Sequence, residues 1–135
     1  MTMDKIKTNN RFAVKAGAMI AAMLMMTGIA SADNFGAISF STANGARGWS
    51  NDYNSQNEAE QRALNECYGA GGTGCIIAIW FSNACGSLAV GNGYGWGAGW
   101  DGNRNRADNK ALRACRSHNN VNCQIVESVC NSNAY

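Results

Sequence analysis

The sequence predicts an α+β fold: two pseudo-symmetric β-β-α-β repeats with antiparallel sheet and two helices, stapled by disulfides. Three observations lead to this prediction. Shifting the chain against itself by 48 positions brings Cys67 onto Cys115 and Cys75 onto Cys123. The same order of strand and helix patterns occurs on both sides of that offset. The chain also has an even number of cysteines, six. Together these features indicate a duplicated supersecondary unit.

An export signal is expected over residues 1–32. Four basic residues open the chain, an uncharged apolar run covers residues 16–30, and Ala30-Ser31-Ala32 has the small-x-small pattern of a cleavage site. The run is about 15 residues long, short of the roughly 20 that span a bilayer. We therefore expect cleavage, with an uncleaved anchor as the alternative. The protein is then exported, periplasmic or secreted, with no membrane span after signal cleavage.

The mature part, residues 33–135, is expected to form a single domain, with repeat one at 33–85 and repeat two at 86–135. It holds seven basic and eight acidic residues, so the positive balance of the full chain belongs to the export signal. This removes the simplest argument for nucleic-acid binding, and no nucleic-acid partner is expected.

Each repeat is expected to run strand, strand, helix, strand. The first helix begins at Ser55, where Ser55-Gln56-Asn57-Glu58 is a capping-box pattern, and Asn105-Arg106-Ala107-Asp108 takes the equivalent place in repeat two. Small apolar residues recur along one face of both helices, which indicates close packing on a sheet. The expected strands are Phe35–Ser41, Ala46–Ser50 and Ile76–Phe81, then Ser87–Val90, Tyr94–Trp100 and Gln124–Val129.

The six cysteines are expected to form three disulfides, because an exported chain meets no cytosolic reductant. Six cysteines allow 15 pairings, and spacing alone does not choose among them. The duplication favours Cys67–Cys75 and Cys115–Cys123, each tying a helix end to the following strand. Cys85 and Cys130 remain, and pairing them would join the two halves.

No metal and no cofactor are expected. Zinc sites need closely spaced ligand pairs such as C-x₂-C, which the sequence lacks, and the chain has one histidine, His118. His118 follows the second helix, where an imidazole interacts with the helix dipole. With the cysteines bridged, no thiolate remains for covalent catalysis.

Four segments together resemble a known family. They are Phe35–Ile38 (F-G-A-I), Glu58–Cys67 (E-A-E-x-x-A-L-x-x-C), Trp80–Gly86 (W-F-x-N-A-C-G) and the run Gly-Tyr-Gly-Trp-Gly at 93–97. The combination is similar to the bacterial exported family DUF4189, a domain of unknown function, and the likeness covers essentially the whole mature chain. The resemblance implies the fold and export, and it assigns no catalytic residues.

The run Gly91–Trp100 alternates glycine with larger residues. In an extended strand, Tyr94, Trp96, Ala98 and Trp100 would share one face and the glycines the other. Two interpretations stay open. The aromatic rings form a stacking platform for sugar rings, peptide or another apolar ligand face, or they pack in the core while the glycines let a second backbone approach.

The two helices differ in charge, acidic in repeat one and basic in repeat two. Arg106 and Lys110 are like charges four residues apart, and Arg113 follows on the same helix. An anionic partner would offset the small cost of this repulsion. The alternative is a solvated surface that keeps the domain soluble.

The sequence therefore favours a non-enzymatic binding module that recognises or inhibits a protein or cell-envelope partner. An inhibitor of a lytic enzyme, or an immunity protein against one, would be such a module. Its expected binding residues are Tyr94, Trp96, Trp100, Arg106, Lys110 and Arg113.

The alternative function is a small envelope-directed glycan hydrolase that uses carboxylates. Asp52, Asp101 and Glu127 are candidates, although nothing in their spacing selects them, and no catalytic residue is assigned. Glu127 interrupts the closing apolar strand where repeat one has Ile79, which also fits a glutamate that simply faces outward.

Overall fold

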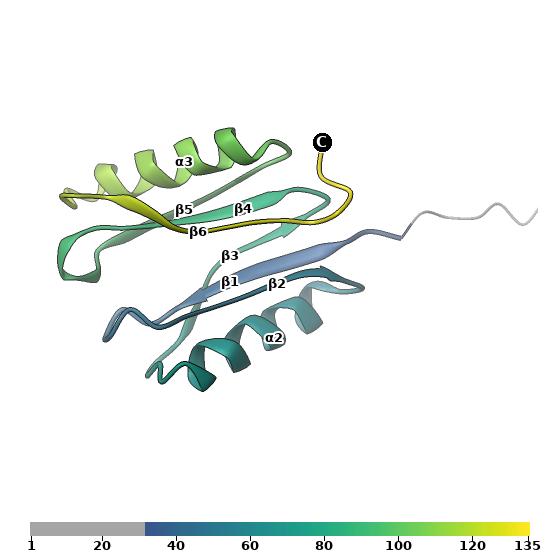
Figure 1. Ribbon diagram of the computed structural model, residues 1–135, viewed down its shortest axis with the longest axis horizontal. Coiled ribbons are helices and arrows are strands. Elements are labelled where there is room, and N and C mark those ends of the chain that lie inside the picture. The colour runs from purple at the N-terminus through teal and green to yellow at the C-terminus, as the bar shows by residue number, and fades with distance from the viewer. Residues whose placement is uncertain (1–31) are drawn as a thin grey trace, which may run out of the picture. The chain divides into compact units, whose positions relative to one another are not determined.

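Two three-stranded antiparallel sheets pack face to face, and one helix covers the outer face of each (Figure 1). The computed structural model describes residues 32–135, which form one compact body. The two β-β-α-β repeats within it are called the first and second units below. The expected export signal therefore lies outside the described residues, except for Ala32. The α+β class and the repeated β-β-α-β order predicted from the sequence are confirmed.

The elements fall where the repeat places them, within a few residues. The first unit contains β1 (Phe35–Phe40), β2 (Arg47–Tyr53), α2 (Gln56–Gly69) and β3 (Ile76–Ser82). The second unit contains β4 (Cys85–Val90), the 3₁₀ turn η1 (Asn92–Tyr94), β5 (Trp96–Asp101), α3 (Arg104–Ser117) and β6 (Gln124–Cys130). The strand orders are β2-β1-β3 in the first sheet and β5-β4-β6 in the second.

The helix starts follow their capping residues. α2 begins as predicted, because Ser55 Oγ accepts a hydrogen bond from the backbone N–H of Glu58 at 3.2 Å. α3 begins earlier than predicted. Asn103 Oδ1, and not the side chain of Asn105, accepts from the backbone N–H of Arg106 at 3.2 Å.

The main apolar core lies between the two sheets. Alternate residues of β1 and β4 point into it, while the residues between them face the helices. Phe81 of β3 fills the space beside Gly36 and Gly86, where a Cβ atom would collide with its ring. The buried members of this core are Ile38, Phe40, Phe81, Ala84, Leu88 and Val129.

Each helix packs on its sheet through small residues, as the alanine pattern predicts. Gly48 of β2 and Gly97 of β5 lie beneath the helices, and a Cβ atom at either position would overlap helix backbone atoms. Glycines of the aromatic-rich strand therefore let α3 approach closely. The buried helix residues are Ala59, Ala63 and Cys67 in α2 and Ala107, Ala111 and Cys115 in α3.

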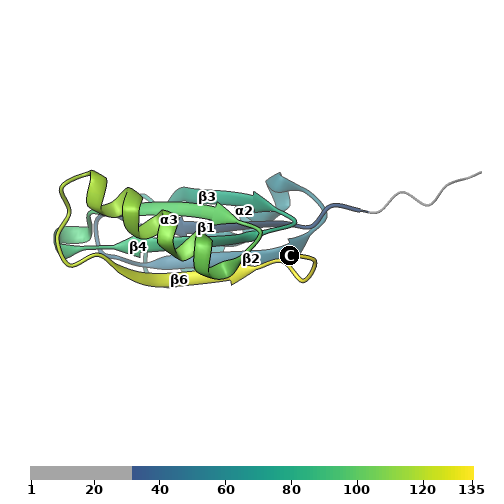
Figure 2. The same cartoon turned by 90° about the horizontal axis from the view of Figure 1, so that it is seen from above.

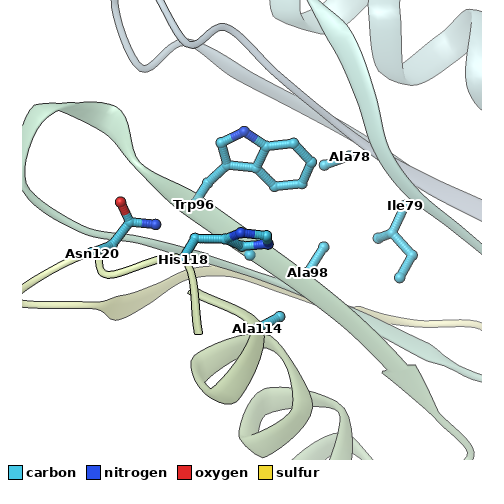
Figure 3. Close-up of a pocket in the computed structure, with 8 residues that line it drawn as sticks. Ala78, Ile79, Trp96, Ala98, Ala114, His118 and Asn120 are labelled. Carbon is cyan, nitrogen blue, oxygen red and sulfur yellow. The ribbon is translucent and has the colours of Figure 1, made fainter. Parts of the chain in front are cut away.

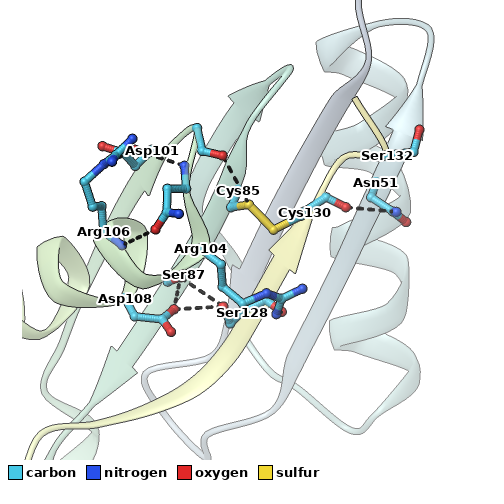
Figure 4. The surroundings of a disulfide bond; sticks show 12 residues. Asn51, Cys85, Ser87, Asp101, Arg104, Arg106, Asp108, Ser128, Cys130 and Ser132 are labelled. Atoms are coloured by element: carbon cyan, nitrogen blue, oxygen red, sulfur yellow. Dashed lines mark hydrogen bonds and ion pairs between the residues drawn. A yellow bond between two sulfur atoms is a disulfide. The ribbon is translucent and has the colours of Figure 1, made fainter. Parts of the chain in front are cut away.

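Serine hydroxyls fasten the sheets to the helices. Ser50 Oγ donates to the carbonyl oxygen of Ala59 in α2 at 2.6 Å. In the second unit, Ser128 Oγ donates to the carboxylate of Asp108 in α3 at 2.8 Å, and Ser87 Oγ donates to the same oxygen (Figure 4). These bonds satisfy polar groups at the close helix–sheet contacts.

All six cysteines are bridged, in the pairs Cys67–Cys75, Cys115–Cys123 and Cys85–Cys130. The first two tie helix ends to the following strands, as the duplication predicts. The third joins neighbouring strands of the second sheet, because Cys85 opens β4 and Cys130 closes β6 (Figure 4). The prediction that it would join the two halves is therefore wrong. β4 starts at Cys85, directly after a turn in which Asn83 has a φ of +52°.

The sheet pair has two equivalent sides. β3 contacts β5 on one side and β2 contacts β6 on the other, and Figure 2 shows β3 along one side of the sheet pair and β6 along the other. On the β2–β6 side, Asn51 Nδ2 donates to the carbonyl oxygen of Cys130 at 3.2 Å (Figure 4). The duplication relates these sides, since β3 corresponds to β6 and β5 to β2.

Within residues 32–135, no helix has the length and apolar character needed to cross a bilayer.

Candidate functional site

A groove runs where β3 meets β5, and we call it the apolar groove. Its first part has a volume of about 540 Å³ and is formed by β3, β5 and the end of α3 (Figure 3). A second part of about 450 Å³ continues along β3 to Trp80 and Trp100. The residues that line the first part include Ala78, Ile79, Trp96, Ala98, Ala114 and His118. His118 caps the C-terminal end of α3, as its position in the sequence suggests.

The two tryptophans of β5 differ in exposure. Trp96 is half-buried, and its ring packs edge-to-face with that of Phe40, with 6.3 Å between the ring centroids. Trp100 lies two alternations further along the same face and is 53% exposed. Trp96 therefore belongs partly to the core, whereas Trp100 presents its ring to solvent at the end of the apolar groove.

Tyr94 does not belong to the strand, so the prediction that the strand begins there is wrong. Tyr94 ends the turn η1 with a φ of +62°, and β5 begins at Trp96. The Tyr94 ring lies against Gly45 in the loop between β1 and β2, where a Cβ atom on the glycine would meet it. Tyr94 thus contacts the first unit instead of continuing the aromatic face of β5.

The basic residues Arg106 and Lys110 both engage Asp101 at the end of β5. Arg106 Nε lies 2.8 Å from Asp101 Oδ1 (Figure 4), and Lys110 Nζ lies 2.9 Å from Oδ2. The pKa of Asp101 lies well below its ordinary value. The largest cause is the hydrogen bond from the backbone N–H of Asn103, and the two cations, Lys110 and Arg106, add to it. Lys110 Nζ also sits 5.7 Å from the ring centroid of Trp100, while Arg113 is exposed further along α3.

A second groove lies on the equivalent side, where β2 meets β6, and we call it the charged groove. Its volume is about 580 Å³. Strand register establishes the equivalence, because Trp49 pairs with Ile38 as Ala98 pairs with Leu88. Glu127 stands at the position of Ile79. The side chains that distinguish this groove are Arg47, Trp49, Glu66 and Glu127.

The family match spans both sheets. The model for a domain of unknown function, DUF4189, matches residues 35–130, from the first residue of β1 to the last of β6. The chain belongs to the DUF4189 family. Among solved structures, the NMR structure of Rv1813c from Mycobacterium tuberculosis is similar to this DUF4189 domain, with a TM-score of 0.55 and 24% identity over 78% of this chain and 81% of that one. That likeness shows the shared fold alone. No curated protein matches the chain.

Glu127 is a half-buried carboxyl group in the charged groove of the DUF4189 domain. Burial raises its pKa above the ordinary value, Arg47 and the backbone N–H of Ser128 act in the opposite direction, and the neighbouring Glu66 adds to the rise. Arg47 Nε lies 3.9 Å from Glu127 Oε2, which is longer than a hydrogen bond. Glu66, on α2, is the carboxylate whose negative charge acts on Glu127.

The other two carboxylates considered for hydrolysis have partners of their own. Asp52 accepts from the backbone N–H of Ser132 at 2.8 Å and from the side-chain amide of Asn34 at 3.0 Å. Asp101 is held by the cations of α3. Neither Asp52 nor Asp101 is among the residues that line the groove of Glu127.

Arg47, Trp49 and Glu66 are absent from the candidates that the sequence suggests. The offset of 48 that aligns Glu127 with Ile79 also aligns Glu66 with Ala114, so a comparison of the repeats marks both differences. Trp49 corresponds to Ala98 at an offset of 49 instead, and the register of the strands is needed to see it.

Proposed function

We propose that this DUF4189 domain is an exported, non-enzymatic binding module whose apolar groove takes an extended acidic segment of a partner protein. The observation that carries the proposal is the exposure of Trp100. This large apolar side chain is 53% exposed at the end of the apolar groove, beside Lys110. Exposed tryptophans beside grooves are typical of residues that dominate binding energy.

Export is supported by the three disulfides and by the sequence of residues 1–32. Disulfides persist in oxidising compartments and are rare where thiol reductants act. The basic opening, apolar run and small-x-small triplet supply the targeting pattern. A periplasmic or secreted protein would meet its partner in the cell envelope or outside the cell.

An extended ligand is favoured by the strands that border the apolar groove. β3 and β5 are each the outer strand of their sheets, so each has one side without a strand neighbour in its own sheet. Outer strands bind extended peptides through main-chain hydrogen bonds, and pockets take alternate side chains. The apolar lining between Trp96 and Trp100 would receive the apolar side chains of such a segment.

Acidic character of the ligand is favoured by α3, which borders the groove. The helix carries five basic residues and one acidic residue. Asp101 balances Arg106 and Lys110 in part, but it is one carboxylate against two cations. The remaining positive charge, including exposed Arg113, would attract glutamate or aspartate side chains that alternate with apolar ones.

A Trp100→Ala variant is expected to weaken binding of such a segment at least tenfold, because truncating a tryptophan at a binding hot spot typically costs about 2 kcal/mol or more. The probe is a ten-residue peptide of alternating valine and glutamate, and the measurement is isothermal titration calorimetry at low salt. The free energy of unfolding is expected to change by less than about 1 kcal/mol, because Trp100 is half in solvent.

Two controls distinguish specific binding in the apolar groove from non-specific binding. Tyr68→Ala removes an aromatic ring of similar exposure from α2 and is expected to leave the affinity unchanged. A peptide with lysine in place of glutamate is expected not to bind. Equal affinity of the Trp100→Ala variant and the natural protein, or equal binding of both peptides, would contradict the proposal.

A further inference from the structure

The duplication has produced two equivalent grooves with different chemistry. The apolar groove has Ile79, Trp96, Ala98 and Ala114 where the charged groove has Glu127, Arg47, Trp49 and Glu66. The two volumes are similar, about 540 Å³ and about 580 Å³. A ligand for the charged groove must therefore differ in kind from the extended apolar segment proposed for the other side.

Trp49 provides an aromatic surface in the charged groove. The side chain lies on β2 and is 42% exposed. Its backbone N–H donates to Glu66 Oε2 at 3.3 Å, which ties the strand to α2 beside the groove. An exposed indole face next to hydrogen-bonding side chains suits a ligand that is apolar on one face and polar at its edges, as a sugar ring is.

Glu127 has acceptor capacity that the protein leaves available. Its carboxylate is half-buried, it accepts from one backbone N–H, that of Ser128, and its ion pair with Arg47 is long, at 3.9 Å. A carboxylate has about four acceptor positions, and a desolvated one gains from any hydroxyl that donates to it. Arg47 in turn offers guanidinium N–H groups to ligand oxygens. Donors and acceptors are thus both available at one place.

The charges of the charged groove are balanced, which argues for a neutral ligand. Glu66 is paired with Arg62, whose guanidinium nitrogen lies 2.7 Å from Glu66 Oε1. Glu127 is paired with Arg47. Two carboxylates and two guanidiniums leave no net charge to attract an ion, while their polar atoms remain able to bind hydroxyl groups.

We infer that the charged groove is a binding site for a neutral oligosaccharide. A sugar ring stacks on Trp49, its hydroxyls donate to Glu127, and Arg47 donates to its oxygen atoms. Glu66 orders the groove by holding β2 and Arg62. This site is separate from the apolar groove and does not depend on the peptide ligand proposed there.

The experiment is a calorimetric titration of the mature protein with two neutral probes, the β-1,4-linked tetramer of N-acetylglucosamine and maltotetraose. Binding of at least one is expected. Trp49→Ala is expected to weaken that binding at least tenfold, and Glu127→Gln at least threefold, because the amide retains the shape but loses the charged acceptor. Circular dichroism and urea unfolding of each variant establish that the fold is retained.

The Trp100→Ala variant is the matched control, since it removes an exposed tryptophan from the equivalent groove. Its sugar affinity is expected to equal that of the natural protein. The inference is overturned if neither probe binds at millimolar concentration, if Trp49→Ala binds as well as the natural protein, or if Trp100→Ala weakens sugar binding as much as Trp49→Ala.

Discussion

The Gly97→Ala variant is expected to lose about 3 kcal/mol of unfolding free energy, at the upper end of the usual cost of overpacking. A Cβ atom at Gly97 would overlap the backbone nitrogen of Cys115 and the carbonyl carbon of Ala114 in α3. Backbone atoms of a packed helix cannot avoid the added Cβ by a change of rotamer, as a side chain can. The helix would therefore have to move away from the sheet. Urea denaturation followed by circular dichroism measures the effect.

Two further glycines test the same cause. Gly48→Ala is expected to cost a similar amount, because a Cβ there would overlap the carbonyl oxygen of Ala63 and the backbone nitrogen of Cys67 in α2. Gly69→Ala is the control, because no atom outside its chain neighbours and the nearby backbone of α2 lies within 4 Å of its added Cβ. At the end of α2, alanine is expected to stabilise by about 0.5 kcal/mol. A Gly97→Ala variant as stable as Gly69→Ala would show that α3 does not lie so close to β5.

Removal of the Cys85–Cys130 bridge is expected to destabilise the domain more than removal of Cys115–Cys123. The two bridges span 45 and 8 positions, and loop entropy alone gives about 4 kcal/mol for the longer and about 2.5 kcal/mol for the shorter. The comparison is between the double variants Cys85→Ala with Cys130→Ala and Cys115→Ala with Cys123→Ala.

The two pairs are well matched for this comparison. In each, one cysteine is buried and the other is half-buried, so the packing losses are similar. Urea denaturation under non-reducing conditions gives both free energies. A larger loss from removing the short bridge would mean that local strand and helix packing, not restriction of the unfolded chain, governs what these disulfides contribute.

The repeat made most of the fold predictable. Its common offset located both helices and all six strands, and it chose the observed disulfides from the possible pairings. The errors lie at turns. The period of two in the glycine and aromatic run continues through Tyr94, so alternation alone does not show that the chain turns there with a positive φ.

The second error has a sequence signal that can be named. The predicted boundary puts Cys85 at the end of repeat one, whereas Cys85 opens β4 after a tight turn. Asn83 occupies that turn with a φ of +52°, a conformation that asparagine adopts more readily than most residues. An asparagine between two apolar segments therefore marks the true start of the second unit.

The candidate site was less predictable than the fold, because it depends on which sheet edges meet. Trp100 and the cations of α3 are close in the sequence, so the sequence predicts them together. Trp49 and Glu127 lie on β2 and β6, and only the face-to-face packing of the sheets brings them to one groove. Comparison of the repeats nevertheless singled out Glu127, since a carboxyl group replaces an isoleucine there.

The central claim is that divergence of two equivalent grooves separates two ligand classes. The four tryptophans report on it directly: Trp49 lies in the charged groove, and Trp80, Trp96 and Trp100 line the apolar one. The measurement is a ¹H–¹⁵N NMR titration of the indole N–H signals with the valine–glutamate peptide and then with the neutral tetrasaccharides.

The peptide is expected to shift the signals of Trp96 and Trp100 and to leave Trp49 unmoved, and the sugar is expected to do the reverse. A shift of the Trp49 signal with the peptide, or of the Trp100 signal with the sugar, would contradict the claim that each groove binds its own class of ligand. Four unmoved signals with both probes would contradict both binding proposals.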